Sequence, residues 1–194
     1  MKLMKSEKGL LIVFSGPAGC GKSTVLSRYM QKYENCVFSV SATTRKPREG
    51  EADGVNYHFV TRDEFEAMLA RGEMLEHTEY CGNYYGTPLK PILKALEEGK
   101  DVIFDIEVDG AFQVKKRYPE ALLIFMQPPS LEELRARLEG RGTETSEVID
   151  KRMERAETEL GLAEKYDYII VNDTVEDAVE DLESVIEYEH ETRN

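Results

Sequence analysis

The feature that most constrains this chain is the segment from Gly16 to Thr24, which reads GPAGCGKST. It fits the pattern G-x-x-x-x-G-K-[ST], in which a glycine-rich turn curls backbone N–H groups around a phosphate at the start of a helix. The apolar run Leu10–Ser15 predicts a buried strand before the turn, and Ser23–Tyr33 predicts a helix after it. The sequence therefore predicts a strand–turn–helix unit that binds the phosphates of a nucleotide.

Two side chains of this loop have predicted chemical roles. Lys22 is expected to contact the β- and γ-phosphates of ATP, and the Ser23 hydroxyl is expected to coordinate Mg²⁺. The other loop residues contribute to nucleotide binding mainly through their backbone, and these are Gly16, Pro17, Ala18, Gly19, Cys20, Gly21 and Thr24.

Composition excludes several classes of function. The 194 residues suit one core with small insertions, and 25 Lys and Arg against 38 Asp and Glu give a net charge of −13. So acidic a chain is not expected to bind nucleic acid or an anionic membrane. No apolar run approaches the ~20 residues of a membrane span, and residues 1–8 do not resemble a secretory signal. Cys20, Cys36 and Cys81 have no metal-type spacing, which predicts reduced thiols and a cytoplasmic location.

Strand and helix patterns alternate along the chain. Further buried strands are expected at Val37–Val40, Asp101–Glu107, Ala121–Met126 and Tyr168–Val171. Ser130 and Glu133 predict a capping box at one helix start, and residues 175–190 carry apolar positions at helical spacing. Continuous apolar strands between helices predict an α/β fold, with a parallel sheet covered on both faces.

Two stretches interrupt this alternation. Residues 41–90 are polar, glycine-rich and aromatic, with a hairpin pattern around Gly82-Asn83, and residues 139–157 begin with EGRGT and continue as a charged helix. Both are predicted to leave the core, bind the acceptor and close over the reaction, which would exclude water from the transferred phosphoryl group.

The first excursion contains a predicted receptor for a second phosphate. Arg45 and Arg48 offer forked cations, and Tyr57 and Tyr85 offer phenol hydroxyls. A carboxylate such as Glu76 does not suit a phosphate, but it suits guanine, whose N1–H and N2–H₂ donors can reach one carboxylate together. Adenine lacks this pair of donors and would leave a buried carboxylate unpaired.

These motifs resemble the guanylate kinases, a family of nucleoside monophosphate kinases. The resemblance is carried by GPAGCGKST, SATTRKPREGE, GVNYHFV, GNYYGT, RLEGRGTET and IIVND, in that order along nearly the whole chain. It implies a three-layer α/β/α P-loop kinase core with a parallel sheet. It also implies that the core comprises residues 1–40, 91–138 and 158–194, that residues 41–90 form a GMP-binding (NMP-binding) subdomain, and that residues 139–157 form a lid. The implied reaction is Mg²⁺-dependent phosphoryl transfer from ATP to GMP or dGMP.

The resemblance also implies a role for each matching residue. Those that would hold the GMP phosphate are Arg45, Arg48, Tyr57 and Tyr85. Those that would read guanine are Ser41, Glu76 and Thr87. The arginines expected to converge on the ATP phosphates and the transferred group are Arg137, Arg141 and Arg152.

Three further roles follow from the same resemblance. Asp105 would serve Mg²⁺ through water at the end of a core strand, and Asn172 would lie near adenine. Glu107, two residues after Asp105 and on the same side of the strand, would lie near the acceptor nucleoside. Glu107 stands where many members of the family have Asp, so it adds a methylene at that site.

Three other functions are compatible with parts of the pattern. The first is a kinase of the same architecture that acts on AMP, a pyrimidine nucleotide or ribose 1,5-bisphosphate, against which Ser41, Glu76 and Thr87 favour guanine. The second is a non-catalytic scaffold that binds phosphopeptides, against which the intact phosphate loop and lid arginines argue. The third is a regulatory nucleotide switch, which would not need an acceptor site. ATP and GMP are therefore the predicted partners, and no oligomeric state is implied.

Overall fold

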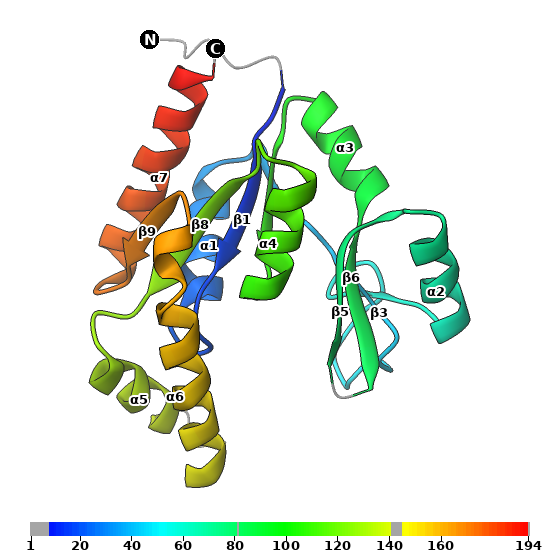
Figure 1. Ribbon diagram of the computed structural model, residues 1–194. Helices are drawn as coiled ribbons and strands as arrows, with labels where there is room; N and C mark the ends of the chain where they lie inside the picture. Colours follow the sequence, from blue (N-terminus) through cyan, green and yellow to red (C-terminus); the bar gives the residue numbers. More distant parts are fainter. Residues whose placement is uncertain (1–7, 81, 141–144, 194) are drawn as a thin grey trace.

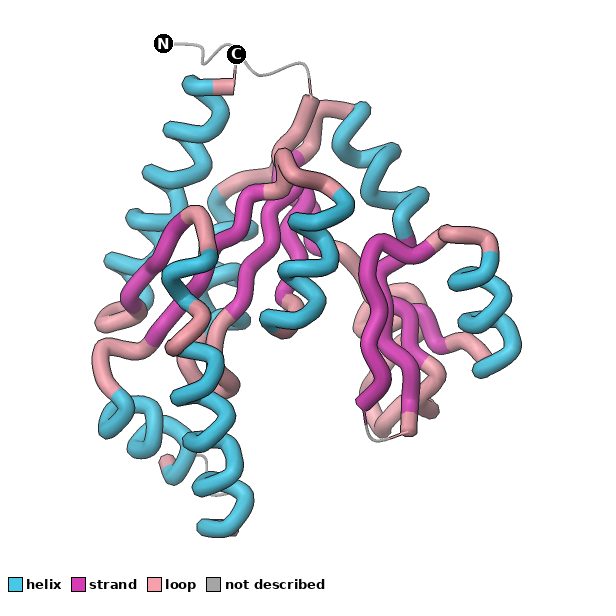
Figure 2. Tube along the Cα trace, viewed as in Figure 1, coloured by secondary structure: helices cyan, strands magenta, loops and turns pink. Residues whose placement is uncertain are grey.

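The computed structural model describes residues 8–80, 82–140 and 145–193. Its largest element is a five-stranded sheet in which every strand runs parallel to its neighbours (Figure 1, Figure 2). In spatial order the strands are β2 (Cys36–Phe38), β7 (Asp101–Asp105), β1 (Leu11–Ser15), β8 (Leu122–Gln127) and β9 (Tyr168–Val171). The predicted parallel sheet is confirmed, and the phosphate loop follows its central strand, β1.

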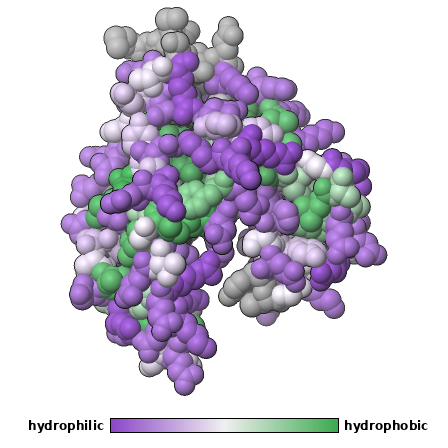
Figure 3. All heavy atoms as spheres, viewed as in Figure 1, coloured by the Kyte–Doolittle hydropathy of each residue, from purple (hydrophilic) through white to green (hydrophobic). Residues whose placement is uncertain are grey.

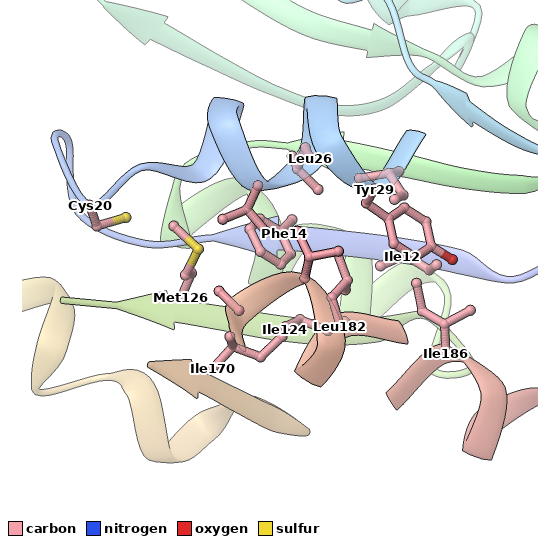
Figure 4. Close-up of a cluster of buried hydrophobic side chains, with 14 of the residues drawn as sticks. Ile12, Phe14, Cys20, Leu26, Tyr29, Ile124, Met126, Ile170, Leu182 and Ile186 are labelled. Atoms are coloured by element: carbon pink, nitrogen blue, oxygen red, sulfur yellow. The ribbon is translucent and has the colours of Figure 1, made fainter. Parts of the chain in front are cut away.

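Helices cover both faces of this sheet. One face packs against α1 (Lys22–Lys32) and α7 (Val175–Thr192), and the other against α3 (Leu89–Glu97), α4 (Val108–Arg117) and the short 3-10 helix η1 (Ala163–Lys165). Figure 4 shows Ile12, Phe14 and Ile124 of the sheet among side chains of α1 and α7. Because successive strand residues point to opposite faces and both faces are buried, the strands are continuously apolar.

A smaller sheet lies beside the core and contains most of the predicted acceptor site (Figure 1). Its strands are, in spatial order, β4 (His58–Phe59), β3 (Ala42–Thr43), β6 (Asn83–Pro88) and β5 (Met74–Tyr80). β5 and β6 form the predicted hairpin and pair antiparallel. Helix α2 (Arg62–Ala70) buries Phe65 against this sheet and starts at a capping box formed by Thr61 and Glu64.

The smaller sheet and α2 form one arm of the molecule. The other arm is formed by α5 (Leu131–Glu139) and α6 (Ser146–Leu160) (Figure 1). The Ser130 side chain caps α5 by accepting from the Glu133 backbone N–H at 3.1 Å. The reciprocal half of the predicted capping box is replaced, because the Glu133 carboxylate accepts from Arg137 one helical turn further on, at 3.0 Å.

Two strands end earlier than their apolar runs predict. β2 ends at Phe38, and β7 ends at Asp105 rather than at Glu107. Glu107 is instead the N-cap of α4, since the chain leaves the sheet after Asp105. The prediction that Asp105 and Glu107 share one side of a strand is therefore wrong, because the start of a helix determines the direction of Glu107.

Candidate active site

The phosphate loop adopts backbone conformations that require glycine. Gly16 has φ +151° and Gly21 has φ +96°. A Cβ at Gly16 would lie 2.0 Å from the Met126 carbonyl oxygen, and one at Gly21 would lie 2.4 Å from Asn172 Nδ2. Both contacts are too short for any side chain. The loop ends where α1 begins at Lys22, so the first N–H groups of that helix point into the loop, as an anion site requires.

Lys22 lies across this loop. Its Nζ donates to the carbonyl oxygens of Gly16 at 2.6 Å and Pro17 at 3.3 Å, and lies 3.9 Å from Asp105 Oδ1. The adjacent strands β1 and β7 bring Lys22 and Asp105 together, since Phe14 pairs with Asp105. Burial raises the pKa of the Asp105 carboxyl, and the Lys22 charge opposes this shift. The structure thus places a cation and a carboxylate at the mouth of the loop.

A cavity of about 430 Å³ opens beside these two residues. Ser23 and Asp105 border one end of it, and Leu26, Met30 and Phe38 provide an apolar wall. The predicted metal ligands therefore face the same space, although they come from α1 and β7, which are far apart in the sequence.

Asn172, predicted to lie near adenine, links the phosphate loop to the segment that follows β9. Its side chain is 3% exposed, and Nδ2 donates to the Cys20 carbonyl oxygen at 2.6 Å. The Cys20 side chain points into the core (Figure 4), and burial raises the pKa of its thiol. Asn172 thus holds the loop by a bond to the Cys20 backbone.

The structure describes two of the three predicted lid arginines, Arg137 and Arg152. Arg137 donates to the Asn172 carbonyl oxygen at 3.2 Å and to Glu133, which brings α5 against the residues that follow β9. Arg152 is half-buried on α6. Arg141 lies outside the described residues.

Arg45 forms an ion pair with Glu51, which the sequence analysis did not predict. Its Nη1 and Nη2 donate to the two carboxylate oxygens of Glu51, each at 2.9 Å, and Glu51 also accepts from the Arg48 backbone N–H at 2.7 Å. These bonds hold the pKa of the Glu51 carboxyl below its usual range. The loop is thus closed around one carboxylate. An acidic residue three positions after Arg48 is the signal that could have indicated it.

Aromatic side chains complete the cluster around Arg45. Its guanidinium carbon lies 5.4 Å from the ring centroid of Tyr57 and 5.8 Å from that of Phe59. Tyr57, just before β4, and Tyr85, on β6, meet edge to face with their ring centroids 6.0 Å apart, and in the sheet β3 lies between these two strands. The structure therefore brings together three of the four residues predicted to hold a phosphate, and Arg48 lies exposed in the same loop.

Glu76 and Thr87, two of the predicted guanine readers, form a buried pair. Thr87 Oγ1 donates to Glu76 Oε1 at 2.6 Å, and Glu76 is only 6% exposed. Burial raises the pKa of the Glu76 carboxyl, the charge of Glu107 adds to this effect, and the bonds from Thr87 oppose it. Gly110 of α4 packs against the pair, because a Cβ there would lie 3.1 Å from Glu76 Oε2.

A second cavity, of about 210 Å³, connects the two sheets. Ser41 and Tyr57 line it from the smaller sheet, and Asp105 and Ile106 from the core. Phe38 and Asp105 border both cavities, so the cleft runs from the phosphate loop to the predicted acceptor residues. Figure 3 shows the molecule hollowed between its two arms.

Glu107 directly follows Ile106 of the cavity lining, and its side chain is largely exposed. Its carboxylate forms an ion pair of 2.7 Å with Arg155 of α6, a residue that the sequence reading did not identify. No residue pattern indicates this pair, because it joins separate elements.

None of the helices in the described ranges is both long and apolar enough to cross a bilayer.

Known proteins match this chain over almost its entire length. The family model described as guanylate kinase matches residues 8–189. The guanylate kinase of Halalkalibacterium halodurans is 54% identical over 187 residues, which cover 96% of this chain and 92% of the relative. That of Lactococcus lactis is 55% identical over 184 residues, which cover 95% and 90%.

A solved structure agrees with these relatives. The crystal structure of guanylate kinase from Anaplasma phagocytophilum superposes with a TM-score of 0.76 at 35% identity, covering 96% of this chain and 88% of that one. The sequence resemblance, the arrangement of the cleft and the full-length matches lead to one conclusion: this chain belongs to the guanylate kinase family.

Proposed function

We propose that this chain transfers the terminal phosphoryl group of ATP to GMP, giving ADP and GDP, and that it also accepts dGMP. The observation that carries the proposal is the buried Glu76–Thr87 pair on the sheet that also carries Tyr85 of the Arg45 cluster. Two cavities that share Phe38 and Asp105 lead from Ser23, next to Lys22, to Ser41 and Tyr57 of the acceptor side. The names of the relatives support the same activity. A cytoplasmic location, inferred from the cysteines, belongs to the same proposal.

The donor side binds ATP through the loop backbone and through Lys22. Lys22 Nζ now bonds to two loop carbonyls, and the β- and γ-phosphates would replace these acceptors. Arg137, Arg152 and the predicted Arg141 would offset the charge that spreads over the transferred group. Because such a transition state needs little covalent assistance, positioning and charge neutralisation supply most of the catalysis.

The residues at the mouth of the loop fit Mg²⁺. Ser23 offers a hydroxyl and Asp105 a carboxylate on the same cavity, and Mg²⁺ prefers oxygen ligands in this mixed protein-and-substrate arrangement. Among the described residues, no group of three or more His, Cys, Asp or Glu side chains could hold a metal, so substrate oxygens and water would complete the shell. When bound, Mg²⁺ would neutralise and orient the ATP phosphates.

The acceptor side binds GMP at both ends. Glu51 holds one edge of the Arg45 guanidinium and directs it to the space beside Tyr57 and Tyr85, where the phosphate would lie. The Glu76 carboxylate would accept from guanine N1–H and N2–H₂, with Ser41 and Thr87 beside it. No general base is required, because the attacking oxygen belongs to a phosphate dianion.

An ADP-release assay with Mg·ATP and a panel of acceptors tests this function. The panel contains GMP, dGMP, AMP, CMP, UMP, dTMP and ribose 1,5-bisphosphate. We expect release with GMP and dGMP, little with AMP, and a large loss in Glu76→Ala but not in the control Glu79→Ala, an exposed residue of the same strand. Turnover with another acceptor would overturn the role of Glu76. ATP binding without any turnover would support a scaffold or a switch.

A further inference from the structure

Arg155 lies on α6 and connects that helix to the wall of the acceptor cleft. Its Nη2 pairs with Glu107 Oε2 at 2.7 Å, while its Nε donates to Glu159 Oε1 at 2.8 Å. Glu159 is mostly buried, with 13% of its side chain exposed, and so provides a firm anchor. Two carboxylates thus orient one guanidinium, and the Arg155 side chain is held in a defined direction.

Glu107 lies in a short segment between residues that line the cleft and a residue that packs against Glu76. Asp105 and Ile106 line the cleft directly. Gly110, one turn into α4, abuts the Glu76 carboxylate. Glu107 is the N-cap between them, and its negative charge contributes to the raised pKa of Glu76. Glu107 is therefore close enough to Glu76 for its charge and direction to affect the acceptor site.

The same helix also carries a predicted catalytic arginine. Arg152 precedes Arg155 by three positions on α6, so the two side chains lie on neighbouring turns of one helical face. Met153 and Ala156, which directly follow these two arginines, are buried and anchor α6 in the core. The Arg155–Glu107 pair therefore links the helix of the donor-side arginine to the acceptor wall.

We infer that Arg155 is a positioning residue of the acceptor site, which holds the Glu107 carboxylate at the rim of the cleft and offsets its charge beside Glu76. This inference rests on the proposed function. GMP brings a phosphate dianion into a cleft that already contains Glu76 and Asp105. An uncompensated Glu107 would add repulsion and a mobile side chain at the point of entry.

Because the Arg155–Glu107 ion pair is exposed, its proposed role in GMP binding can be distinguished from a role in protein stability. The side chains of Arg155 and Glu107 are 48% and 57% exposed. Surface pairs of this kind contribute little to folding. Loss of the pair should therefore affect GMP binding far more than the melting temperature.

Steady-state kinetics of four variants test the inference. We expect Arg155→Met to raise KM for GMP about fivefold, with kcat and KM for ATP changed less than about twofold. Arg155→Lys should restore most of the loss, because it retains the charge. Arg155→Gln should match Arg155→Met, because it also lacks the charge that offsets Glu107. Arg135→Met is the matched control, since Arg135 pairs with Asp150 of α6 at 2.8 Å.

The outcomes distinguish this inference from the proposed function. An unchanged KM for GMP in Arg155→Met, or an Arg155→Lys variant as impaired as Arg155→Met, would overturn the role of Arg155 while the wild-type enzyme still used GMP. A lower melting temperature with unchanged KM would show a structural role only and would also overturn it. A wild-type chain that does not use GMP would overturn both. If Arg155→Met fails to fold, Arg155→Gln, which removes the charge but keeps a polar side chain, gives the same comparison with Arg155→Lys.

Discussion

Arg45 and Glu51 form a two-point ion pair in which Nη1 and Nη2 each donate to one carboxylate oxygen at 2.9 Å. Only 15% and 19% of their side chains are exposed, so water screens the pair less than it screens most surface pairs. Glu51 also accepts from the Arg48 backbone. One acidic residue thus fixes the geometry of a site that is otherwise built to bind an anion.

The Glu51→Gln variant tests this arrangement. The amide has one acceptor oxygen in place of two and no charge, so Arg45 loses one of its two bonds and the full charge that fixes its direction. We expect KM for GMP to rise about tenfold, with a smaller effect on kcat and none on KM for ATP. Steady-state kinetics with each substrate varied in turn would measure this. Glu49→Gln, an exposed change in the same loop, is the control, and equal KM values in both variants would contradict the prediction.

Glu76→Gln should stabilise the free protein while impairing its function. Burial raises the pKa of Glu76, so the folded chain favours the protonated carboxyl more than the unfolded chain does. The resulting stability is present at low pH and is lost as the pH rises through the folded pKa. Glutamine remains neutral, so its melting temperature should exceed that of the parent at about pH 8, and the difference should shrink toward about pH 4.

The same variant should bind GMP poorly. The glutamine NH₂ would oppose the guanine donors, and we expect KM for GMP to rise on the order of 100-fold. Calorimetry and kinetics on one preparation would test both effects, with Glu79→Gln as the control. A lower melting temperature at neutral pH would contradict the stability argument, even if the GMP result held.

Gly110→Ala should separate helix stability from acceptor binding. Alanine favours an α-helix by about 1 kcal/mol over glycine, so α4 itself gains. The new Cβ would lie 3.1 Å from Glu76 Oε2 and 3.3 Å from Ile106 Cδ1, and the carboxylate would have to shift. We expect a severalfold higher KM for GMP without a lower melting temperature. An unchanged KM would mean that Glu76 can move without loss of guanine binding.

Asn172→Ala should affect the donor side. It removes the 2.6 Å bond to the Cys20 carbonyl and leaves that buried oxygen unpaired, at a cost of about 1–3 kcal/mol in unfolding free energy. We expect KM for ATP to rise about fivefold because the loop loosens, with GMP binding unchanged. Asn35→Ala removes a similar bond to the Gly99 carbonyl far from the loop. Equal ATP kinetics in the two variants would contradict a specific role for Asn172.

Elements encoded by local patterns were predicted closely. β9 spans Tyr168–Val171 as predicted, and α7 extends the predicted helix over residues 175–190 only to Thr192. The errors lay at the ends of β2 and β7. At β7 hydrophobicity continues past Asp105, but the chain already turns into α4. Periodicity indicates which residues are buried, but not where backbone pairing stops.

At the candidate site, too, local patterns predicted some features and tertiary contacts determined others. Lys22 and the Arg45–Arg48 loop were predicted from residue type and spacing, and the role of Glu76 was predicted from the resemblance to guanylate kinases. The bonds of Glu51, Asn172 and Arg155 were not predicted. Each of these residues has an ordinary polar side chain whose role depends on its partner. For Asn172 and Arg155 the partner comes from another part of the chain, and no local pattern can identify it.

The sequence by itself determined the phosphate loop, the buried strands and the chemical types available to bind two nucleotides, because these depend on neighbouring residues and their periodicity. Only the tertiary structure decided which side chains share a cleft. The parallel pairing of β1 with β7 sets Asp105 beside Lys22, and the packing of α4 sets Gly110 against Glu76. Strand register and helix packing join distant residues through many weak contacts, and no single segment encodes them.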